Sequence, residues 1–225
     1  MNNHNQMYHS QSNQFLYFSS CEDSNGNLDR FIKSYFNWND KTVLEAGIGL
    51  GRITDKYIDK AKKIVATDKS EKMLNLCKKK FSRELDKIEF LKCDHDKLYK
   101  NLYNFCFDTF ISAYSLSYLV DKYKDPGKLK NVLDGIFSLN IKKFIVIESI
   151  GVFSKNDHHF IRYKNYFNYL YDRFSFRFLN TDFVFADNSE ATYYAEVFFG
   201  KKTRDIIRDS GIIRIPETTC VWFNE

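Results

Sequence analysis

The sequence has no long apolar run and very few prolines. No hydrophobic stretch approaches the roughly 20 residues that a membrane-spanning helix needs, so we predict no membrane segment. The N-terminal residues are polar and lack the apolar core of a secretory signal, which favours a cytoplasmic protein. Only 2 prolines occur, while Lys, Asn, Ile, Phe and Tyr are abundant, a composition typical of an AT-rich genome.

Cysteine patterns that would indicate a disulfide framework or a zinc site are also missing. The chain has 5 dispersed cysteines, namely Cys21, Cys77, Cys93, Cys106 and Cys220. Their odd number, and the lack of any C-x-x-C pair, argue against both kinds of site. The adjacent residues Asp157, His158 and His159 do not form a metal-ligand pattern, because neighbouring side chains usually diverge. We therefore predict free thiols and no metal.

The net charge of +5 comes without a nucleic-acid-binding pattern. Lysines are scattered, and the densest run, Lys78 to Lys80, falls on a predicted solvent-facing helix. No block alternates basic and aromatic residues, as a groove that follows a nucleic-acid backbone would. We expect neither nucleic acid nor a membrane as partner. The 225 residues, 44% of them hydrophobic, suffice for one sizeable domain.

The most informative residues form a short strand followed by a glycine-rich turn. Residues 42–46 are largely apolar and include Glu45, and Gly47, Gly49 and Gly51 follow in alternation. Glycine has no Cβ, so the backbone there can approach a ligand closely. A short helix predicted over residues 53–61 would direct its first N–H groups to the same place. The G-x-G-x-G spacing differs from the dinucleotide pattern G-x-G-x-x-G, and no P-loop ending follows it.

Strands and helices alternate after this point. Strands are predicted at residues 42–46, 63–67, 88–91, 107–113 and 144–147, and helices at 28–36, from the N-cap Ser70 onward, and from Pro126 onward. A helix over 203–210, ending at Gly211, and strands at 212–215 and 219–223 would close the fold. This order predicts an α/β fold with a doubly wound, mostly parallel sheet.

Polar side chains fall at the carboxyl ends of the predicted strands. They are Glu45, Asp68, Asp94, Tyr114 and Glu148. Ligands of doubly wound folds bind at these ends. Asp68 follows the second strand about 20 residues beyond the glycine turn, where an acid can accept hydrogen bonds from both ribose hydroxyls. Capping of a following helix is the alternative role for Asp68 and Asp94.

The segment Gly47-x-Gly49-x-Gly51-Arg52-Ile53-Thr54 resembles motif I of the class I S-adenosylmethionine (SAM)-dependent methyltransferases. It is most similar to the protein α-N-terminal methyltransferase-like branch, whose motif reads G-x-G-x-G-R-I-T. The resemblance covers residues 28–150 and, loosely, 200–225. It implies a seven-stranded Rossmann-like sheet, SAM as cofactor and S-adenosylhomocysteine (SAH) as product. We accordingly predict a polar lead at 1–27 and a methyltransferase domain at 28–225, with an aromatic-rich substrate-cap insertion at 150–195, after strand five.

The resemblance also implies roles at the cofactor. The three glycines would let the backbone approach the methionine part and the ribose, and Arg52 would pair with the carboxylate of SAM. A surface ion pair with Asp55 is the alternative for Arg52. Glu45 would attract the ammonium group or orient the loop. Further cofactor contacts are predicted at Asp68 (ribose), Asp94 (adenine amino group), Lys69, His95 and Tyr114.

Tyr118, Glu148 and His158 are the residues predicted to act near the transferred methyl group. Methyl transfer is an in-line displacement in which the protein mainly aligns the reactants and removes a proton where needed. Glu148 is a candidate base because it ends the fifth strand, and His158 or His159 because of the ordinary pKa of histidine. The N-terminal methyltransferases carry His where Tyr118 stands, which weakens the case for a peptide amine as acceptor.

The prediction is therefore an enzyme that methylates an oxygen or nitrogen of a small molecule. A peptide or protein amine is the first alternative acceptor, and a noncatalytic partner protein with this fold is the second alternative. A nucleic-acid acceptor is disfavoured, because no Asn-Pro-Pro-Tyr-like motif stands at residues 115–118. The identity of the acceptor and the oligomeric state do not follow from the sequence.

Overall fold

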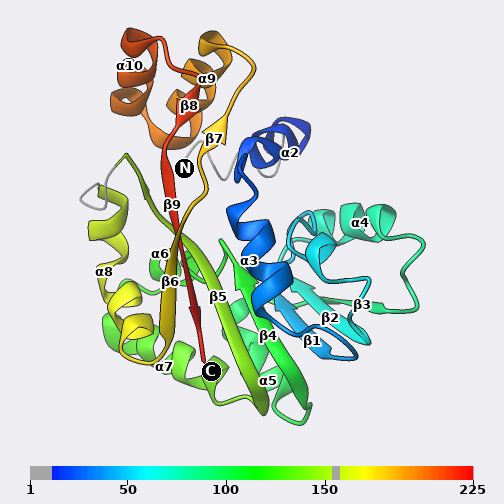
Figure 1. The fold of residues 1–225 in the computed structure, drawn as a ribbon. Coiled ribbons are helices and arrows are strands. Elements are labelled where there is room, and N and C mark those ends of the chain that lie inside the picture. Colours follow the sequence, from blue (N-terminus) through cyan, green and yellow to red (C-terminus); the bar gives the residue numbers. More distant parts are fainter. Residues whose placement is uncertain (1–11, 154–157, 225) are drawn as a thin grey trace. The chain divides into compact units, whose positions relative to one another are not determined.

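The computed structural model describes residues 12–153 and 158–224 (Figure 1). The chain divides into two compact units. The larger unit comprises Phe31–Ser149, Ile161–Phe178 and Cys220–Glu225, and the smaller unit comprises Met1–Arg30, Ile150–Phe160 and Leu179–Thr219. Each is described separately below.

A sheet of seven strands forms the framework of the larger unit. The strands are β1 (Thr42–Ala46), β2 (Lys63–Asp68), β3 (Ile88–Lys92), β4 (Phe107–Ala113), β5 (Ile141–Val152), β6 (Ser175–Asn180) and β9 (Glu217–Phe223). Their order across the sheet is β3-β2-β1-β4-β5-β9-β6. The pairs β1–β2, β2–β3, β1–β4 and β4–β5 are parallel. The predicted doubly wound, mostly parallel seven-stranded sheet is confirmed.

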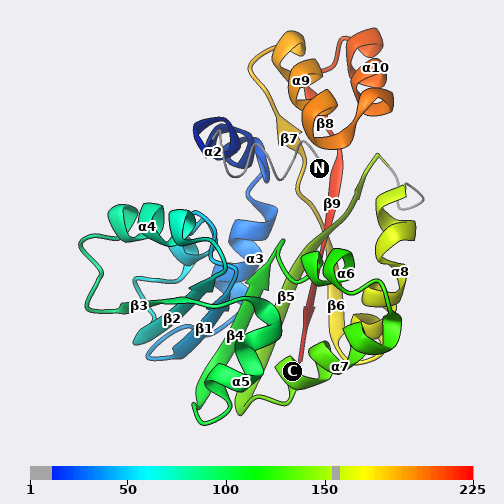
Figure 2. The same cartoon turned by 180° about the vertical axis from the view of Figure 1, so that it is seen from behind.

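Helices flank the strands, and those near residues 28–36, after Ser70 and from Pro126 are the ones that the sequence pattern predicts. The helices are α3 (Asn27–Tyr35), α4 (Glu71–Lys80), α5 (Leu98–Leu102), α6 (Tyr118–Lys122), α7 (Pro126–Phe137) and α8 (His158–Tyr171). Seen from behind in Figure 2, α5, α6 and α7 lie on the near face of the sheet. Ser70 caps α4 by accepting from the Met73 N–H, and Asp125 caps α7 by accepting from the Lys128 N–H.

The core lies on both faces of the central strands. Val43 and Leu44 on β1 and Phe110 and Ile111 on β4 are fully buried, as is Ile145 on β5. Apolar residues on consecutive positions of a strand are typical of a parallel sheet that helices cover on both sides. This burial fixes the level at which the strands end, and therefore the positions of the polar residues that follow them.

Some segments differ from the sequence-based expectations. The predicted helix at 53–61 is only the short 3₁₀ turn η1 (Thr54–Lys56). Thr54 and Tyr57 both donate to Glu45 Oε2, and side chains three residues apart align in a 3₁₀ turn rather than an α-helix. The expected strand at 212–215 is the two-residue β8 (Arg214–Ile215), which pairs with β7 (Phe183–Val184) outside the main sheet.

Several elements were not predicted, including α5, α6 and α8. Strand β6, inside the segment 150–195, forms an edge of the main sheet. Helix α2 (Ser12–Cys21) lies in the segment expected to be a polar lead. Aromatic residues such as Phe176 and Phe178 favour strands as much as they favour the core of an insertion, so composition alone does not separate the two.

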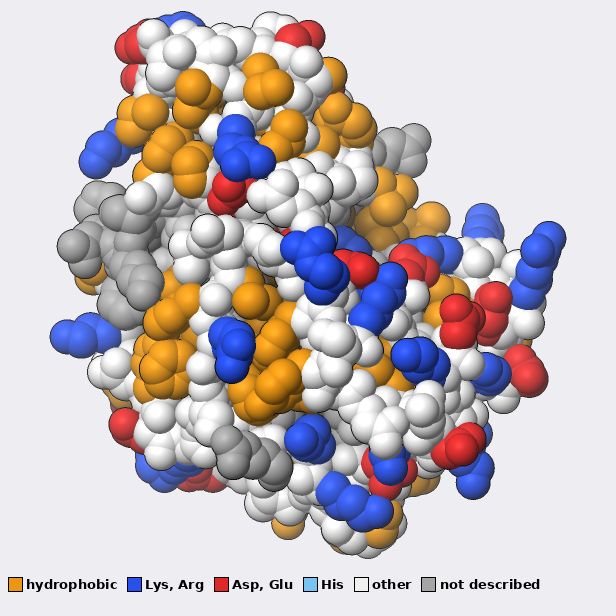
Figure 3. Space-filling model, in the orientation of Figure 1, with side chains coloured by type: hydrophobic (Ala, Val, Ile, Leu, Met, Phe, Trp, Pro, Cys, Tyr) orange, Lys and Arg blue, Asp and Glu red, His pale blue; other side chains and the backbone are white. Residues whose placement is uncertain are grey.

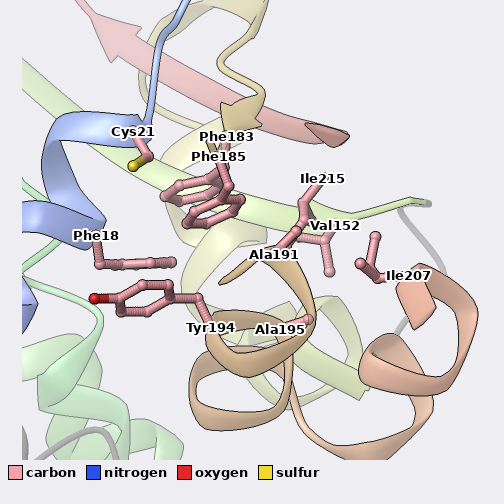
Figure 4. Packing of buried hydrophobic residues seen from close by; sticks show 10 residues of the cluster. All are labelled: Phe18, Cys21, Val152, Phe183, Phe185, Ala191, Tyr194, Ala195, Ile207 and Ile215. Carbon is pink, nitrogen blue, oxygen red and sulfur yellow. The ribbon is translucent and has the colours of Figure 1, made fainter. Parts of the chain in front are cut away.

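The smaller unit has a core of stacked aromatic rings. Besides α2, β7 and β8 it contains α9 (Asn188–Tyr194), the π-helical turn η3 (Ala195–Phe199) and α10 (Lys201–Ser210). The Phe18 ring lies 4.5 Å from Phe183 and 5.8 Å from Tyr194, and Figure 4 shows these rings together with Phe185. Helix α10 ends at Gly211, whose φ of 69° is left-handed, as the sequence predicts.

Surface charge is mixed on the face shown in Figure 3, where acidic side chains stand between the basic ones. Exposed ion pairs in the larger unit include Lys63–Glu89 and Lys92–Glu71. Within residues 12–153 and 158–224, no helix is both long and apolar enough to cross a membrane.

Candidate functional site at the carboxyl ends of the parallel strands

The glycine turn after β1 is held against the end of β2. The N–H groups of Gly47 and Ile48 both donate to the Thr67 carbonyl, at 2.8 and 2.9 Å, and the Gly49 N–H donates to Asp68 Oδ2 at 3.0 Å. The φ angles of Gly47, Gly49 and Gly51 are 77°, 55° and 70°, a region that other residues rarely adopt. The alternating glycines therefore let this turn fold back on the neighbouring strand.

Two of these glycines are also required by close packing. A Cβ on Gly47 would stand 1.9 Å from Ser115 Oγ, and one on Gly51 would stand 2.3 Å from Cε2 of Phe81. Both distances are far inside van der Waals contact. At these two positions the space that a missing side chain leaves is filled by other residues of the protein.

Asp68 lies at the end of β2, as predicted, and its carboxylate faces the glycine turn. The side chain is 6% exposed. Oδ2 accepts from the Gly49 N–H, and Oδ1 accepts from the Ser70 N–H at 2.8 Å. A carboxylate accepts hydrogen bonds through both of its oxygens, so a bond that caps a helix does not by itself prevent bonds from ribose hydroxyls. The capping alternative and the ribose role are thus compatible.

Glu45 is buried, at 3% exposure, and is engaged inside the protein. Its Oε2 accepts from the Thr54 hydroxyl at 2.7 Å and from the Tyr57 hydroxyl. Burial raises the pKa of Glu45 to about 7. These contacts place Glu45 where it orients the segment after the glycine turn, one of the two roles considered for it.

Asp94 and His95 follow β3 and begin the short turn η2 (His95–Lys97). Asp94 Oδ1 accepts from the His95 N–H, and Oδ2 binds Lys122 Nζ at 2.7 Å. The half-buried His95 ring places Nε2 2.7 Å from Ser115 Oγ. Burial lowers the pKa of His95 to about 4, so the ring is neutral near pH 7.

Arg52 and Lys69 each lie over an aromatic ring of the segment that follows β4. The Arg52 guanidinium is 4.9 Å from the centre of the Tyr114 ring, and Lys69 Nζ is 5.4 Å from the centre of the Tyr118 ring. Both distances are typical of cation–π contacts. The predicted residues Arg52, Lys69, Tyr114 and Tyr118 are therefore brought to the same edge of the sheet.

The prediction that Glu148 ends the fifth strand is wrong, because β5 continues to Val152 and Glu148 lies inside it. Glu148 is as buried as Glu45, at 3% exposure. Its carboxylate accepts from the Ser117 N–H at 2.9 Å, from the Ser117 hydroxyl at 3.0 Å and from the Tyr166 hydroxyl at 3.1 Å. Burial raises the pKa of Glu148 to about 7. Its role as a base stays a prediction. The side chain of His158, the other predicted base, lies outside the described part of the structure.

The sequence did not single out Ser115, Ser117, Tyr166 or Lys122. Each binds a predicted residue: Ser115 binds His95, Ser117 and Tyr166 bind Glu148, and Lys122 binds Asp94. Hydroxyl residues in loops carry no periodic pattern, so only the position of Ser115 and Ser117 after β4 could have drawn attention to them. Among the described residues, no group of three or more His, Cys, Asp or Glu side chains is placed to hold a metal ion.

The donor and acceptor groups at this edge suit a ligand with hydroxyl and amino groups. Asp68 and Asp94 offer carboxylate oxygens at the ends of β2 and β3, and the neutral His95 lies beside them. Nδ1 of His95 is buried without a protein partner. A buried polar atom of this kind costs about 1–3 kcal/mol unless it is satisfied, which a ligand atom can do. The residues present therefore fit an adenosine-containing molecule such as SAM.

Comparison with known proteins finds similarity to methyltransferases. Residues 43–133, which run from the second residue of β1 to beyond β4 and include the glycine turn, match a family model described as a methyltransferase domain. The match covers less than half of the chain and supports a methyltransferase domain in that part. No curated protein matches the sequence.

Solved structures share the fold at low sequence identity. A candidate methyltransferase from Bacillus halodurans C-125 superposes with a TM-score of 0.57 at 10% identity, covering 87% of this chain and 96% of that one. The YcgJ protein from Bacillus subtilis gives 0.56 at 12% identity, covering 88% and 97%. A candidate RNA methyltransferase from Pyrococcus horikoshii gives 0.53 at 14% identity, covering 90% and 84%. At these identities the likeness shows the fold alone.

Proposed function

We propose that this protein transfers the methyl group of SAM to an oxygen or nitrogen of a small-molecule acceptor by in-line displacement. The observation that best supports the proposal is the hydrogen bond from the Gly49 N–H to Asp68 Oδ2, in which nitrogen and oxygen are 3.0 Å apart. It joins the glycine turn to the acid at the end of the neighbouring strand, where an adenosine ribose can reach both.

In this proposal the cofactor lies along the carboxyl ends of β1 to β4. Asp68 accepts from the ribose hydroxyls, and Asp94 and His95 meet the adenine. Arg52 binds the methionine carboxylate, while Glu45 and the three glycines shape the turn. Lys69 and Tyr114 complete the cofactor contacts. SAM supplies a methyl group on a positively charged sulfur, which is already strongly electrophilic.

The chain's own contribution is to align the acceptor and exclude water. Tyr118 lies after β4, where we place the acceptor. Its ring is held by Lys69, and burial raises its pKa above the ordinary value, so the phenol stays protonated and can donate a hydrogen bond. The N-terminal methyltransferases, whose motif I this sequence resembles, carry histidine at this place, so a phenol here supports a small molecule rather than a peptide amine.

Calorimetric titration with SAM and SAH tests the cofactor assignment. We expect micromolar binding to the wild type and at least about a tenfold loss in Asp68→Asn, because the amide cannot accept from both hydroxyls and the Gly49 N–H. Asp86→Asn, which alters an exposed acid elsewhere in the larger unit, should bind as the wild type does. No binding to a well-folded wild type would contradict the proposal.

The acceptor class is tested by following transfer of a labelled methyl group. Purified protein is incubated with labelled SAM and either a panel of small alcohols, phenols and amines or a panel of peptides with free N-termini. We expect label in the first panel. Label only in the peptides would instead support a peptide N-methyltransferase, and cofactor binding without transfer to either would favour a noncatalytic role.

A further inference from the structure

The segment after β4 contacts residues that lie on or shortly after strands β1, β3 and β5. We call residues 114–118 the post-β4 loop. The Tyr114 N–H donates to the Ile147 carbonyl on β5, and Ser115 binds His95 after β3. Ser115 also fills the space beside Gly47. A displacement of this loop would therefore change the surroundings of both the glycine turn and His95.

The loop has a strained conformation at its first residue. Tyr114 has a φ of 53°, in the left-handed region that costs a residue with a Cβ about 1–2 kcal/mol. Residues in such conformations persist only where surrounding contacts hold them, and they concentrate at functional sites. The contacts that hold this loop are therefore informative about the site.

Glu148 supplies several of these contacts. Oε1 accepts from the Ser117 N–H and the Tyr166 hydroxyl, and Oε2 accepts from the Ser117 hydroxyl. The carboxylate is 3% exposed, so these donors take the place of water. An acid that already accepts several hydrogen bonds inside the protein has little access to an acceptor molecule.

The charged form of Glu148 is the form that suits these donors. An ionised carboxylate only accepts hydrogen bonds, whereas a protonated one must donate one and so conflicts with one of the donors. Among the described residues, the titratable groups that interact with it include Tyr118 on α6 and Tyr163 and Tyr166 on α8. Burial raises the pKa of all three tyrosines, so among these groups only Glu148 changes charge near pH 7.

We propose that Glu148 is a positioning residue that holds the post-β4 loop against the glycine turn and, through Tyr166, links helix α8 to the cofactor site. The inference rests on the proposed function in one respect, because it takes the cofactor to bind beside this loop. Glu148 then acts on the reaction through the loop and does not take a proton from the acceptor. Protonation of Glu148 loosens the loop, so cofactor affinity falls below neutral pH.

Hydrogen exchange tests the positioning role without any ligand. The amide protons of the post-β4 loop are compared in the wild type, Glu148→Gln and Glu45→Gln. Glu45 is the matched control, because it is equally buried but binds Thr54 and Tyr57. We expect the Ser117 amide to lose protection in Glu148→Gln and to keep it in Glu45→Gln. Equal protection in the wild type and Glu148→Gln would overturn the proposal.

The dissociation constant of SAH, measured from about pH 5.5 to 8.5, separates positioning from a merely structural role. If only the ionised form holds the loop, wild-type affinity drops about tenfold one pH unit below the midpoint. Glu148→Gln should bind more weakly near pH 8 and show no pH dependence. Tyr166→Phe should move the midpoint to higher pH, because the Tyr166 hydroxyl lowers the pKa of Glu148.

The outcomes distinguish this inference from the proposed function. A wild type that binds SAH with a pH profile identical to that of Glu148→Gln keeps the proposed function and rejects the positioning role. A wild type that binds no SAH rejects the proposed function, and hydrogen exchange at Ser117 then decides whether Glu148 holds the loop. Should Glu148→Gln fail to fold, the shift of the midpoint in Tyr166→Phe decides instead.

Discussion

Strands β1 and β5 each carry one glutamate, and the two lie in nearly the same environment. Glu45 and Glu148 are both 3% exposed, both have a pKa raised to about 7 by burial, and both accept from a tyrosine and from a Ser or Thr hydroxyl. Their partners differ in origin. Glu45 binds residues 9 and 12 positions further along the chain, whereas Glu148 binds residues 31 and 18 positions away.

This difference separates local support from coupling between elements. Glu45 stabilises the segment that directly follows its own strand, and a change there should remain near the glycine turn. Glu148 joins β5, the post-β4 loop and α8, so a change there should reach several elements. A buried acid on a strand is therefore not by itself evidence of a ligand contact. The groups that donate hydrogen bonds to it show which part of the protein it supports.

The largest effect is expected at the glycine turn itself. Gly51→Ala places a Cβ 2.3 Å from the Phe81 ring at a φ of 70°, and we expect a loss of about 4 kcal/mol in unfolding free energy. Gly211→Ala is the matched control, because its φ is 69° but nothing lies within 4 Å of the new Cβ. It should lose only about 1 kcal/mol. Urea unfolding measures both, and equal losses would show that packing at Phe81 does not constrain the turn.

The pH dependence of stability should come from both glutamates. Each has its pKa raised from 4.5 to about 7, so the folded protein binds protons that the unfolded chain releases. The stabilising contribution is complete below about pH 4.5 and is lost as the pH rises through about 7, by about 3 kcal/mol for each group.

Urea unfolding across this pH range tests whether stability falls as the pH rises and how much each glutamate contributes to that fall. We expect stability to fall with rising pH in the wild type, and Glu45→Gln and Glu148→Gln each to remove about half of that slope. A wild type that becomes more stable as the pH rises from about 5 to about 7 would contradict the burial of both groups.

Removing the tyrosine hydroxyl that donates to each glutamate tests how strongly the stability of each region depends on that hydrogen bond. Tyr57→Phe should cost about 2 kcal/mol and Tyr166→Phe about 1 kcal/mol, because Glu148 keeps both bonds from Ser117 while Glu45 keeps only Thr54. Tyr103→Phe, at a residue that is 56% exposed, should stay within about 0.5 kcal/mol of the wild type. A larger loss of unfolding free energy in Tyr166→Phe than in Tyr57→Phe would contradict this explanation.

The smallest effect is expected from Lys122→Met. Lys122 Nζ lies 2.7 Å from Asp94 and 2.8 Å from Asp96, but its side chain is 41% exposed. Ion pairs of this kind contribute at most about 1 kcal/mol, so thermal unfolding should shift by only a few degrees and less so in high salt. A loss comparable to that of Tyr57→Phe would mean that α6 depends on this ion pair.

The sequence was sufficient for the elements that a regular pattern encodes. The predicted strands 42–46 and 107–113 coincide with β1 and β4, and the stop at Gly211 coincides with the end of α10. Continuous apolar runs and a C-terminal glycine leave few alternatives. Asp68 could be placed at the glycine turn for the same reason, since the end of β2 was clear.

Features that depend on contacts between distant residues could not be predicted. The bond between Ser115 and His95 joins the ends of β4 and β3, and no spacing in the sequence marks it. Helix α2 and strand β6 lie in segments whose composition suits more than one structure. The hydrogen bond from Tyr57 to Glu45 accompanies a 3₁₀ turn after the glycine turn, where the sequence pattern predicts a helix instead.

Hydrogen exchange of the whole chain with and without SAH tests the central claim most directly. The account predicts that added SAH slows exchange at residues 47–51, 68–70 and 94–95 and in the post-β4 loop, and leaves residues 183–215 of the smaller unit unchanged. Slowed exchange confined to the smaller unit, or no change anywhere in a folded protein, would contradict a cofactor site at the carboxyl ends of β1 to β4.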